Sequence, residues 1–215
     1  GLVLPKVRIR DNLRLEQDQY RIKINGNPVA TTALPVDLLA VLVTAESRHA
    51  VHGHLLRHPA YTQPLLEIAP DELANAQAAG LTFVDASSVL LQHLELVVKR
   101  HAAELLTRDA TRHLVEETRR MTPAVVEELM PDLMKLADVQ RILQRLLVEG
   151  VSIRQLSTIL EVLGDEASRT SSELELTELV RRRLARTICA QYRDARDRLS
   201  VVTLDPELED RGRAG

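Results

Sequence analysis

Histidines gather in the first third of the chain, and imidazole is the side chain that proteins use most often to bind a metal ion. Four of them lie within ten residues, namely His49, His52, His54 and His58. His52 and His54 would share one face of a strand, and His54 and His58 one face of a helix. Because neither backbone brings all four together, and no cysteine lies nearby, we favour a solvated polar segment over a zinc site. A metal-dependent hydrolase built on this cluster stays open as an alternative.

Asp85 and His93 are a carboxylate and an imidazole, the pair of groups that can share a proton in catalysis. They are eight residues apart, which on a helix separates them by about 12 Å. Asp85 fits better as the residue that caps the helix. Cys189 adjoins Ile188 and is typical of a small buried hydrophobic residue rather than of a nucleophile. We therefore expect no catalytic residue, no metal and no cofactor.

The composition argues against an enzyme and against a nucleic-acid-binding protein. Only 2% of the residues are aromatic, whereas ligand clefts and single-strand grooves depend on aromatic walls. The eight glycines form none of the motifs that bind nucleotide phosphates or carry a nucleophilic serine. The net charge is −3. The arginine-rich residues 181–198 are more typical of a dipole-compensating helix end or a subunit contact than of nucleic-acid binding.

Two further features bear on the compartment. A single cysteine excludes an intramolecular disulfide and indicates a reducing environment. No apolar run reaches the roughly 20 residues of a membrane-spanning helix. We therefore expect this sequence to be soluble and cytoplasmic.

The elements that would position these residues begin with strands. Residues 7–10 and 20–24 alternate apolar and charged side chains, which predicts two half-buried strands. The Asn-Gly pair at 25–26 favours a tight turn, after which residues 29–32 would return as the second strand of a hairpin. The apolar run 35–43 is too short to decide between strand and helix.

Residues 44–80 are rich in histidine, proline and alanine and have weak periodicity, which is typical of a small insert rather than a core element. Within this stretch Pro70 would open a short helix and Gly80 would end it. The apolar residues 81–84 then predict a strand that returns to the earlier sheet.

From Asp85 onward the periodicity is helical. Asp85 or Ser87 can cap the first of these helices. Its expected apolar face consists of residues spaced by three and four: Leu90, Leu94, Val97, Val98 and Leu105.

More helices follow at short intervals. Thr107 and Thr122 can cap the next two, and a later apolar stripe ends at Gly150. Two capping boxes are predicted, one formed by Ser152 with Gln155 and one by Ser172 with Glu175.

The second capping box would open a long helix that reaches Ile188. Four or five amphipathic helices joined by short turns predict a compact helical subdomain. Residues 199–204 return to the pattern of a strand, and residues 205–207 would begin another helix.

Several stretches of the chain resemble one protein family. They read LPKVRIRDNL from Leu4, VDASSVLLQH from Val84, KRHAAELL from Lys99, VEELMP from Val126, VQRILQRLL from Val139, VSIRQLSTILE from Val151 and LARTIC from Leu184. In these words the chain resembles the cytosolic domain of the bacterial type III secretion export-gate proteins, the FHIPEP family of flagella and injectisomes. The likeness covers nearly the whole chain outside residues 33–79, and the pattern beside Ile188 is closer to the injectisome branch.

The resemblance implies an α+β mosaic of subdomains. On that layout residues 1–43 and 81–106 form a discontinuous mixed first subdomain. Residues 44–80 form an inserted second subdomain, residues 107–198 a helical, ring-building third, and residues 199–215 the start of a fourth.

The resemblance also implies a docking platform without enzymatic activity. Family members form a ring, a nonamer in the full-length protein, at the cytoplasmic face of the bacterial inner membrane. That ring receives secretion chaperone–substrate complexes and contacts other export-apparatus and ATPase-complex proteins. It reaches the membrane only through an N-terminal region that this sequence does not contain, and it does not bind nucleic acid.

The family's chaperone-docking dimple maps onto this chain with changes. Its D-P-x-F-G-L motif corresponds here to HPAYTQ, so that Tyr61 keeps the aromatic anchor and His58 replaces the acid. The dimple's threonine corresponds to Gln92, and its apolar lining corresponds to Val84 and Val89. The resemblance thus implies a partner-binding site at these five residues.

One alternative comes from another functional class. A stand-alone helical adaptor would use its amphipathic helices to bind a partner helix in an apolar groove, without any ring.

Overall fold

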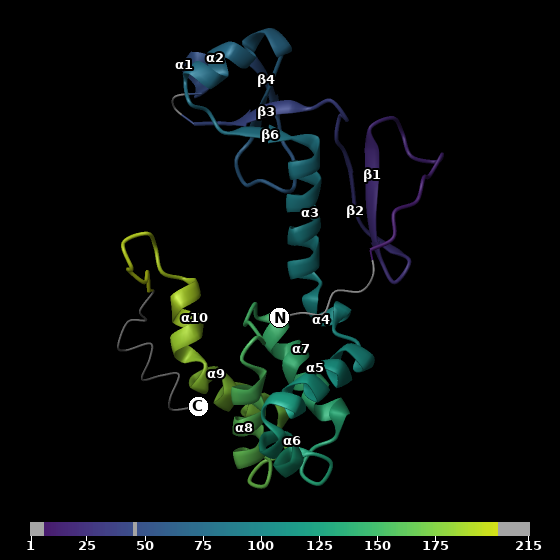
Figure 1. The fold of residues 1–215 in the computed structure, drawn as a ribbon, viewed down its shortest axis with the longest axis vertical. Helices are drawn as coiled ribbons and strands as arrows, with labels where there is room; N and C mark the ends of the chain where they lie inside the picture. The colour runs from purple at the N-terminus through teal and green to yellow at the C-terminus, as the bar shows by residue number, and fades with distance from the viewer. Residues whose placement is uncertain (1–6, 45–46, 202–215) are drawn as a thin grey trace, which may run out of the picture. The chain divides into compact units, whose positions relative to one another are not determined.

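The computed structural model describes residues 7–44 and 47–201 of the chain. These residues fold into two compact units, one of which ends at Leu105 and the other of which begins at Leu106 (Figure 1). The first unit combines small sheets with helices, and the second consists mainly of helices. The predicted α+β mosaic is therefore confirmed.

A two-stranded hairpin opens the first unit. Strand β1 (Gln19–Ile24) pairs antiparallel with β2 (Asn27–Ala33), as the alternation predicted. Asn25 and Gly26 have positive φ angles of 50° and 85°, the backbone form that this two-residue turn requires and that asparagine and glycine tolerate. Tyr20 is half-buried in β1, whereas Arg21 and Lys23 are exposed.

The strand predicted at residues 7–10 is wrong. These residues form neither strand nor helix, and the side chains of Val7 and Ile9 are 65% and 93% exposed. A strand is stabilised by hydrogen bonds to a neighbouring strand, and an alternating pattern does not supply that neighbour.

A four-stranded antiparallel sheet forms the centre of the first unit. Its spatial order is β4 (Gly53–Leu56), β5 (Leu65–Ile68), β3 (Leu39–Leu42) and β6 (Phe83–Asp85). The run 35–43, which the sequence left undecided, thus contains a strand. The strand predicted at 81–84 is confirmed with later bounds.

Residues 44–80 supply two strands of this sheet, so the prediction that they lack a core element is wrong. Each strand has four residues, which is too short for periodicity to reveal. The helix predicted from Pro70 is confirmed as the turn η1 (Pro70–Glu72) followed by α2 (Leu73–Ala78). A short α1 (Ser47–Ala50) precedes β4. Strands from the expected first and second subdomains pair within one sheet, and the four-subdomain division stays a prediction.

Helix α3 (Ala86–Arg100) begins as predicted, because the carboxylate of Asp85 accepts a hydrogen bond from the Ser88 amide at 2.8 Å. Its buried residues are Val89, His93 and Val97. Val97 of the predicted face is therefore confirmed as buried, whereas Leu90 of that face is 40% exposed. The helix has apolar residues on two adjacent faces, and packing against the sheet determines which of these residues are buried. A short α4 (Ala102–Leu105) follows.

The two faces of the sheet carry separate apolar clusters. Ala40 and Val41 are consecutive in β3 and fully buried, yet they belong to different clusters, because successive strand residues point to opposite faces. Val89 of α3 packs in the cluster of Ala40, and Ala76 of α2 packs in the cluster of Val41. A helix therefore packs against each face.

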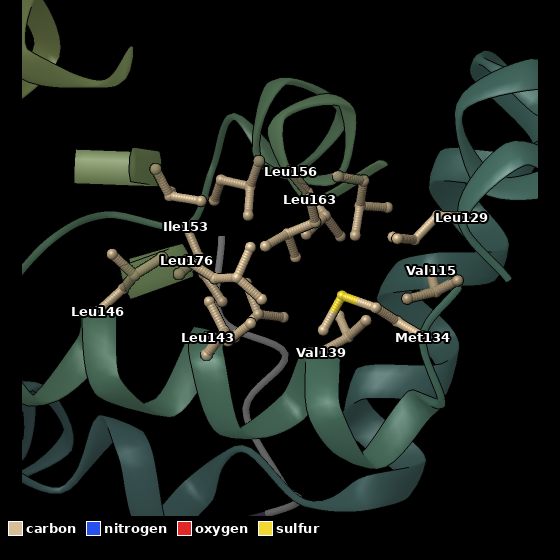
Figure 2. Close-up of a cluster of buried hydrophobic side chains, with 14 of the residues drawn as sticks. Val115, Leu129, Met134, Val139, Leu143, Leu146, Ile153, Leu156, Leu163 and Leu176 are labelled. Carbon is tan, nitrogen blue, oxygen red and sulfur yellow. The ribbon is translucent and has the colours of Figure 1, made fainter. Parts of the chain in front are cut away.

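The helices of the second unit share one apolar core (Figure 2). They are α5 (Arg108–Met121), α6 (Pro123–Leu129), α7 (Leu136–Val148), α8 (Leu156–Glu166), α9 (Glu173–Arg183) and α10 (Ala185–Gln191). Figure 2 shows side chains of α7, such as Leu143 and Leu146, pointing toward Leu156, Leu163 and Leu176. The predicted helical body is thus present.

The caps of this unit were predicted in part. Thr107 caps α5 by accepting from the Ala110 amide at 3.2 Å. Ser172 caps α9, but Glu175 accepts from the hydroxyl of Thr170 and does not close the box.

The box at Ser152 is wrong, since α8 begins only at Leu156 and has no side-chain cap. Burial of Val151 and Ile153 holds the preceding segment in the core instead. The predicted long helix is divided in two, because α9 ends at Arg183 and α10 begins at Ala185.

The last predicted elements lie largely outside the described residues. Leu199 forms an isolated antiparallel bridge with Arg193, and residues 202–215, which include half of the predicted strand and the start of the final helix, are not described.

Substituting Leu143 tests the helical core. Leu143→Ala removes fully buried methyl groups and should lower the free energy of unfolding by about 2–5 kcal/mol. Leu174→Ala, at a position 69% exposed on α9, should change it by less than about 0.5 kcal/mol. Chemical denaturation followed by circular dichroism measures both, and equal effects would contradict the core assignment.

Two glycines should respond with opposite signs. A Cβ at Gly53 would collide with the carbonyl oxygen of Glu67 in the paired strand, so Gly53→Ala should destabilise by more than about 1 kcal/mol. Gly164 of α8 has open space beside it, so Gly164→Ala should stabilise by up to about 1 kcal/mol through helix propensity. Thermal unfolding of both variants checks the register of β4 on β5, which the same sign in both would contradict.

Candidate functional site

Three polar side chains from distant segments meet inside the first unit. Tyr20 lies on β1, His58 on the loop between β4 and β5, and His93 on the buried face of α3. The two imidazoles are 4% and 3% exposed. The His58 and His93 ring centroids are 5.1 Å apart with nearly perpendicular planes, and the tyrosine ring stacks on His58 at 6.2 Å. We call this group the Tyr-His-His cluster.

The hydroxyl of Tyr20 joins the two imidazoles. Its oxygen lies 3.0 Å from Nε2 of His58 and hydrogen-bonds to Nδ1 of His93. Nδ1 of His58 accepts from the backbone amide of Ala60 at 3.1 Å. A neutral imidazole has one donor and one acceptor, so this network assigns the proton of His58 to Nε2, which donates to Tyr20. The hydroxyl of Tyr20 then donates to His93.

Burial keeps all three groups neutral. Desolvation lowers the pKa of His58, and repulsion between the protonated forms of His58 and His93 lowers it further. Desolvation also lowers the pKa of His93, with a second contribution from Arg100. Burial raises the pKa of Tyr20 to about 12. The cluster is therefore a set of hydrogen bonds between uncharged groups at neutral pH.

The residues expected at the partner-binding site lie close to this cluster. Val84 and Val89 are buried in the apolar cluster of the sheet face, and Tyr61 packs half-buried against it. Burial raises the pKa of Tyr61, and so does the charge of Asp85. Val89 has no exposed surface, so it cannot contact a partner directly.

The other two expected residues differ in placement. His58 is buried and points to Tyr20 and His93 rather than to solvent. Gln92 is exposed on α3, and it does not belong to the apolar cluster that holds Tyr61. The structure thus brings Tyr61, Val84 and Val89 together, and it turns His58 toward Tyr20 and His93.

Sequence reasoning missed Tyr20, and it considered His93 only as a catalytic partner of Asp85. Tyr20 occupies the inward position of an alternating strand, and His93 lies four residues from both Val89 and Val97. These periodicities indicate that Tyr20 and His93 point inward. They do not indicate that the two residues, 73 positions apart in the sequence, contact each other.

The histidine group of residues 49–58 does not converge. His49, His52 and His54 are exposed, and only His58 turns inward. Within residues 7–44 and 47–201, no three side chains of His, Cys, Asp or Glu lie close enough to hold a metal ion. The alternative of a metal-dependent hydrolase gains no support from this arrangement.

Known proteins match nearly the whole length of this chain. The model of the FHIPEP family matches residues 1–214. The chain belongs to the FHIPEP family. The flagellar biosynthesis protein FlhA of Bacillus subtilis is 37% identical over 209 residues, which are 97% of this chain and 31% of that protein. This FHIPEP chain thus spans about a third of the length of such a relative.

Solved structures of FHIPEP-like fold agree with the two units. The Chlamydia pneumoniae CdsV protein has a TM-score of 0.86 and 26% identity, covering 100% of this chain and 63% of that chain. CdsV has also been solved in complex with CdsO. Nonameric EPEC SctV-C has a TM-score of 0.66 and 20% identity, covering 98% of this chain and 71% of that one, and it agrees in fold.

The described residues contain no helix that is long and apolar enough to cross a membrane.

Removing the hydroxyl of Tyr20 tests the cluster. Tyr20→Phe would leave the Nε2 proton of His58 and Nδ1 of His93 without their partner, which should lower the free energy of unfolding by about 1–3 kcal/mol. Tyr192→Phe, at a position 63% exposed, is the matched control and should be neutral. Urea denaturation near neutral pH measures both, and an unchanged Tyr20→Phe would contradict the network.

Proposed function

We propose that this chain is part of the docking platform of a type III secretion export gate. It binds secretion chaperone–substrate complexes and makes or breaks no covalent bond. The observation that carries the proposal is the family match over residues 1–214, which includes both compact units.

The proposed docking contact is the surface around Tyr61. A tyrosine seated on a buried apolar floor supplies a large contact area at low entropic cost, the usual form of an interface anchor. Val84 and Val89 form that floor. Gln92 is exposed on α3 and would contribute only at the rim, while His58 would hold the loop that carries Tyr61.

We also propose that the protein works as a homo-oligomeric ring at the cytoplasmic face of the bacterial inner membrane. EPEC SctV-C, a solved protein of the same fold, is a nonamer, and CdsV binds another protein, CdsO. By analogy the helical unit would contribute to the ring, and other export-apparatus and ATPase-complex proteins would bind it. The division into four subdomains, with residues 107–198 as the ring-building one, belongs to this proposal.

The branch of the family is part of the proposal too. The relative described above is a flagellar protein with higher identity, whereas the similar structure is CdsV. We propose the injectisome branch because of the pattern beside Ile188. The stand-alone adaptor receives no separate support, since the family match extends across both units.

Substituting Tyr61 tests the docking proposal. Purified secretion chaperones with bound export substrate, produced from the same genome, are the probes, and calorimetry measures their affinity for the chain. Tyr61→Ala should weaken binding by at least about tenfold, which corresponds to about 1.4 kcal/mol at an anchor residue.

Tyr192→Ala removes an exposed tyrosine outside the proposed contact and should bind like the wild type. Equal binding by Tyr61→Ala, or no binding of any chaperone–substrate complex by the wild type, would refute the proposal.

A further inference from the structure

The Tyr-His-His cluster joins three segments through one hydroxyl group. Tyr20 bonds to a residue 38 positions away on the loop between β4 and β5 and to a residue 73 positions away on α3. It thereby connects the hairpin, the loop and the helix at a single buried point. The loop, residues 57–64, also carries Tyr61.

We propose that the Tyr-His-His cluster is a proton-sensitive latch, which holds the loop of residues 57–64 against the hairpin and α3 at neutral pH and releases it on acidification.

The hydrogen bonds of the latch need neutral rings. His58 accepts from the Ala60 amide through Nδ1 and donates through Nε2. A second proton on His58 would have to sit on Nδ1, where it would face the N–H of Ala60 and remove that bond. The anchor of the loop backbone is therefore lost when His58 is protonated.

His93 is coupled to the same event. A proton on its Nδ1 would replace an acceptor by a donor facing Tyr20. The tyrosine hydroxyl could then accept from both rings, but its own proton would have no acceptor in the cluster. Two imidazolium rings with centroids 5.1 Å apart would also repel each other.

The positive charges that act on the two histidines lower their pKa values further. Arg100 of α3 and the two histidines themselves disfavour a cation at the cluster. Tyr61 on the loop stays neutral, because burial and the charge of Asp85 both raise its pKa. The carboxylate of Asp85 is engaged with the Ser88 amide at the start of α3.

The direction of the pH effect follows from these shifts. In the closed latch the pKa of each histidine lies below its ordinary value of 6.5. In the released state each imidazole regains that ordinary value, so the released state binds more protons just below pH 6.5. The closed latch is thus fully stable above pH 6.5 and loses stability as the pH falls from there through the lowered values.

One consequence depends on the proposed function. If Tyr61 is the docking anchor, release of the loop frees the backbone that positions it, so binding of chaperone–substrate complexes weakens in acid. Closure of the latch itself can be measured without any partner.

Hydrogen exchange of the loop tests the latch in the 215-residue chain. Protection of the amides in residues 57–64, corrected for the intrinsic pH dependence of exchange, should fall at least about threefold between about pH 7.5 and about pH 5.5. The double variant His58→Gln with His93→Asn replaces both rings by groups that do not titrate, and its protection should be independent of pH. His113→Asn, at an exposed site on α5, should behave like the wild type.

Two results would overturn the latch. One is pH-independent protection of the loop in the wild type, and the other is an undiminished pH dependence in the double variant. If the double variant does not fold, nuclear magnetic resonance titration of the wild-type histidines replaces it. A pKa at or above 6.5 for both His58 and His93 then overturns the latch, and values below 6.5 with loss of the Ala60 amide bond support it.

A binding arm separates the latch from the proposed function. Chaperone–substrate affinity is measured at both pH values for wild type and double variant. If the loop opens while affinity stays constant, the latch holds and the docking role of Tyr61 fails. If neither the loop nor the affinity responds to pH, the latch fails and docking through Tyr61 is unaffected.

Discussion

Burial of the central strand β3 on both faces is the constraint on which the first unit depends. Ala40 and Val41 have no exposed surface, and each enters a different apolar cluster. A strand with two apolar faces must be covered twice. The covering helices come from later parts of the chain, α3 on one side and α2 on the other. Ala60 and Tyr61, from the loop between β4 and β5, pack into the same cluster as α3.

The Tyr-His-His cluster is a consequence of that arrangement. Once α3 covers the sheet, His93 is carried into the interior with Val89 and Val97, and a buried polar group must find a hydrogen-bond partner. Tyr20 and His58 supply it from two other segments. The surface proposed to bind partners thus rests on a polar core whose hydrogen bonds depend on the protonation of two rings.

The second unit also pairs its buried polar groups, and among the described residues Gln140 makes the longest-range of these bonds. Gln140 of α7 is buried, donates to the carbonyl of Leu106 at 2.8 Å and accepts from Arg108. These bonds tie the segment before α5 to the middle of α7. Leucine, isoleucine and valine, together with Met134, supply the apolar core. This explains how a chain with 2% aromatic residues forms a compact helical body.

Local signals in the amino-acid sequence were enough to specify the class of several elements. The Asn-Gly pair predicted the hairpin turn, Asp85 and Thr107 predicted two helix starts, and long leucine stripes predicted the helical unit. The sequence stretches that resemble the FHIPEP family also predicted that the chain belongs to it, and the family match over residues 1–214 confirms this. Packing of the folded chain, by contrast, selected which apolar stripe of α3 is buried, left residues 7–10 without a strand partner, and left Ser152 outside any helix cap.

The same holds for the candidate site. The family resemblance implied that Tyr61 lies with Val84 and Val89, but it did not show that His58 turns inward to meet Tyr20. Such choices depend on partners tens of residues away, and no local periodicity encodes the burial or the hydrogen bond that a distant segment provides.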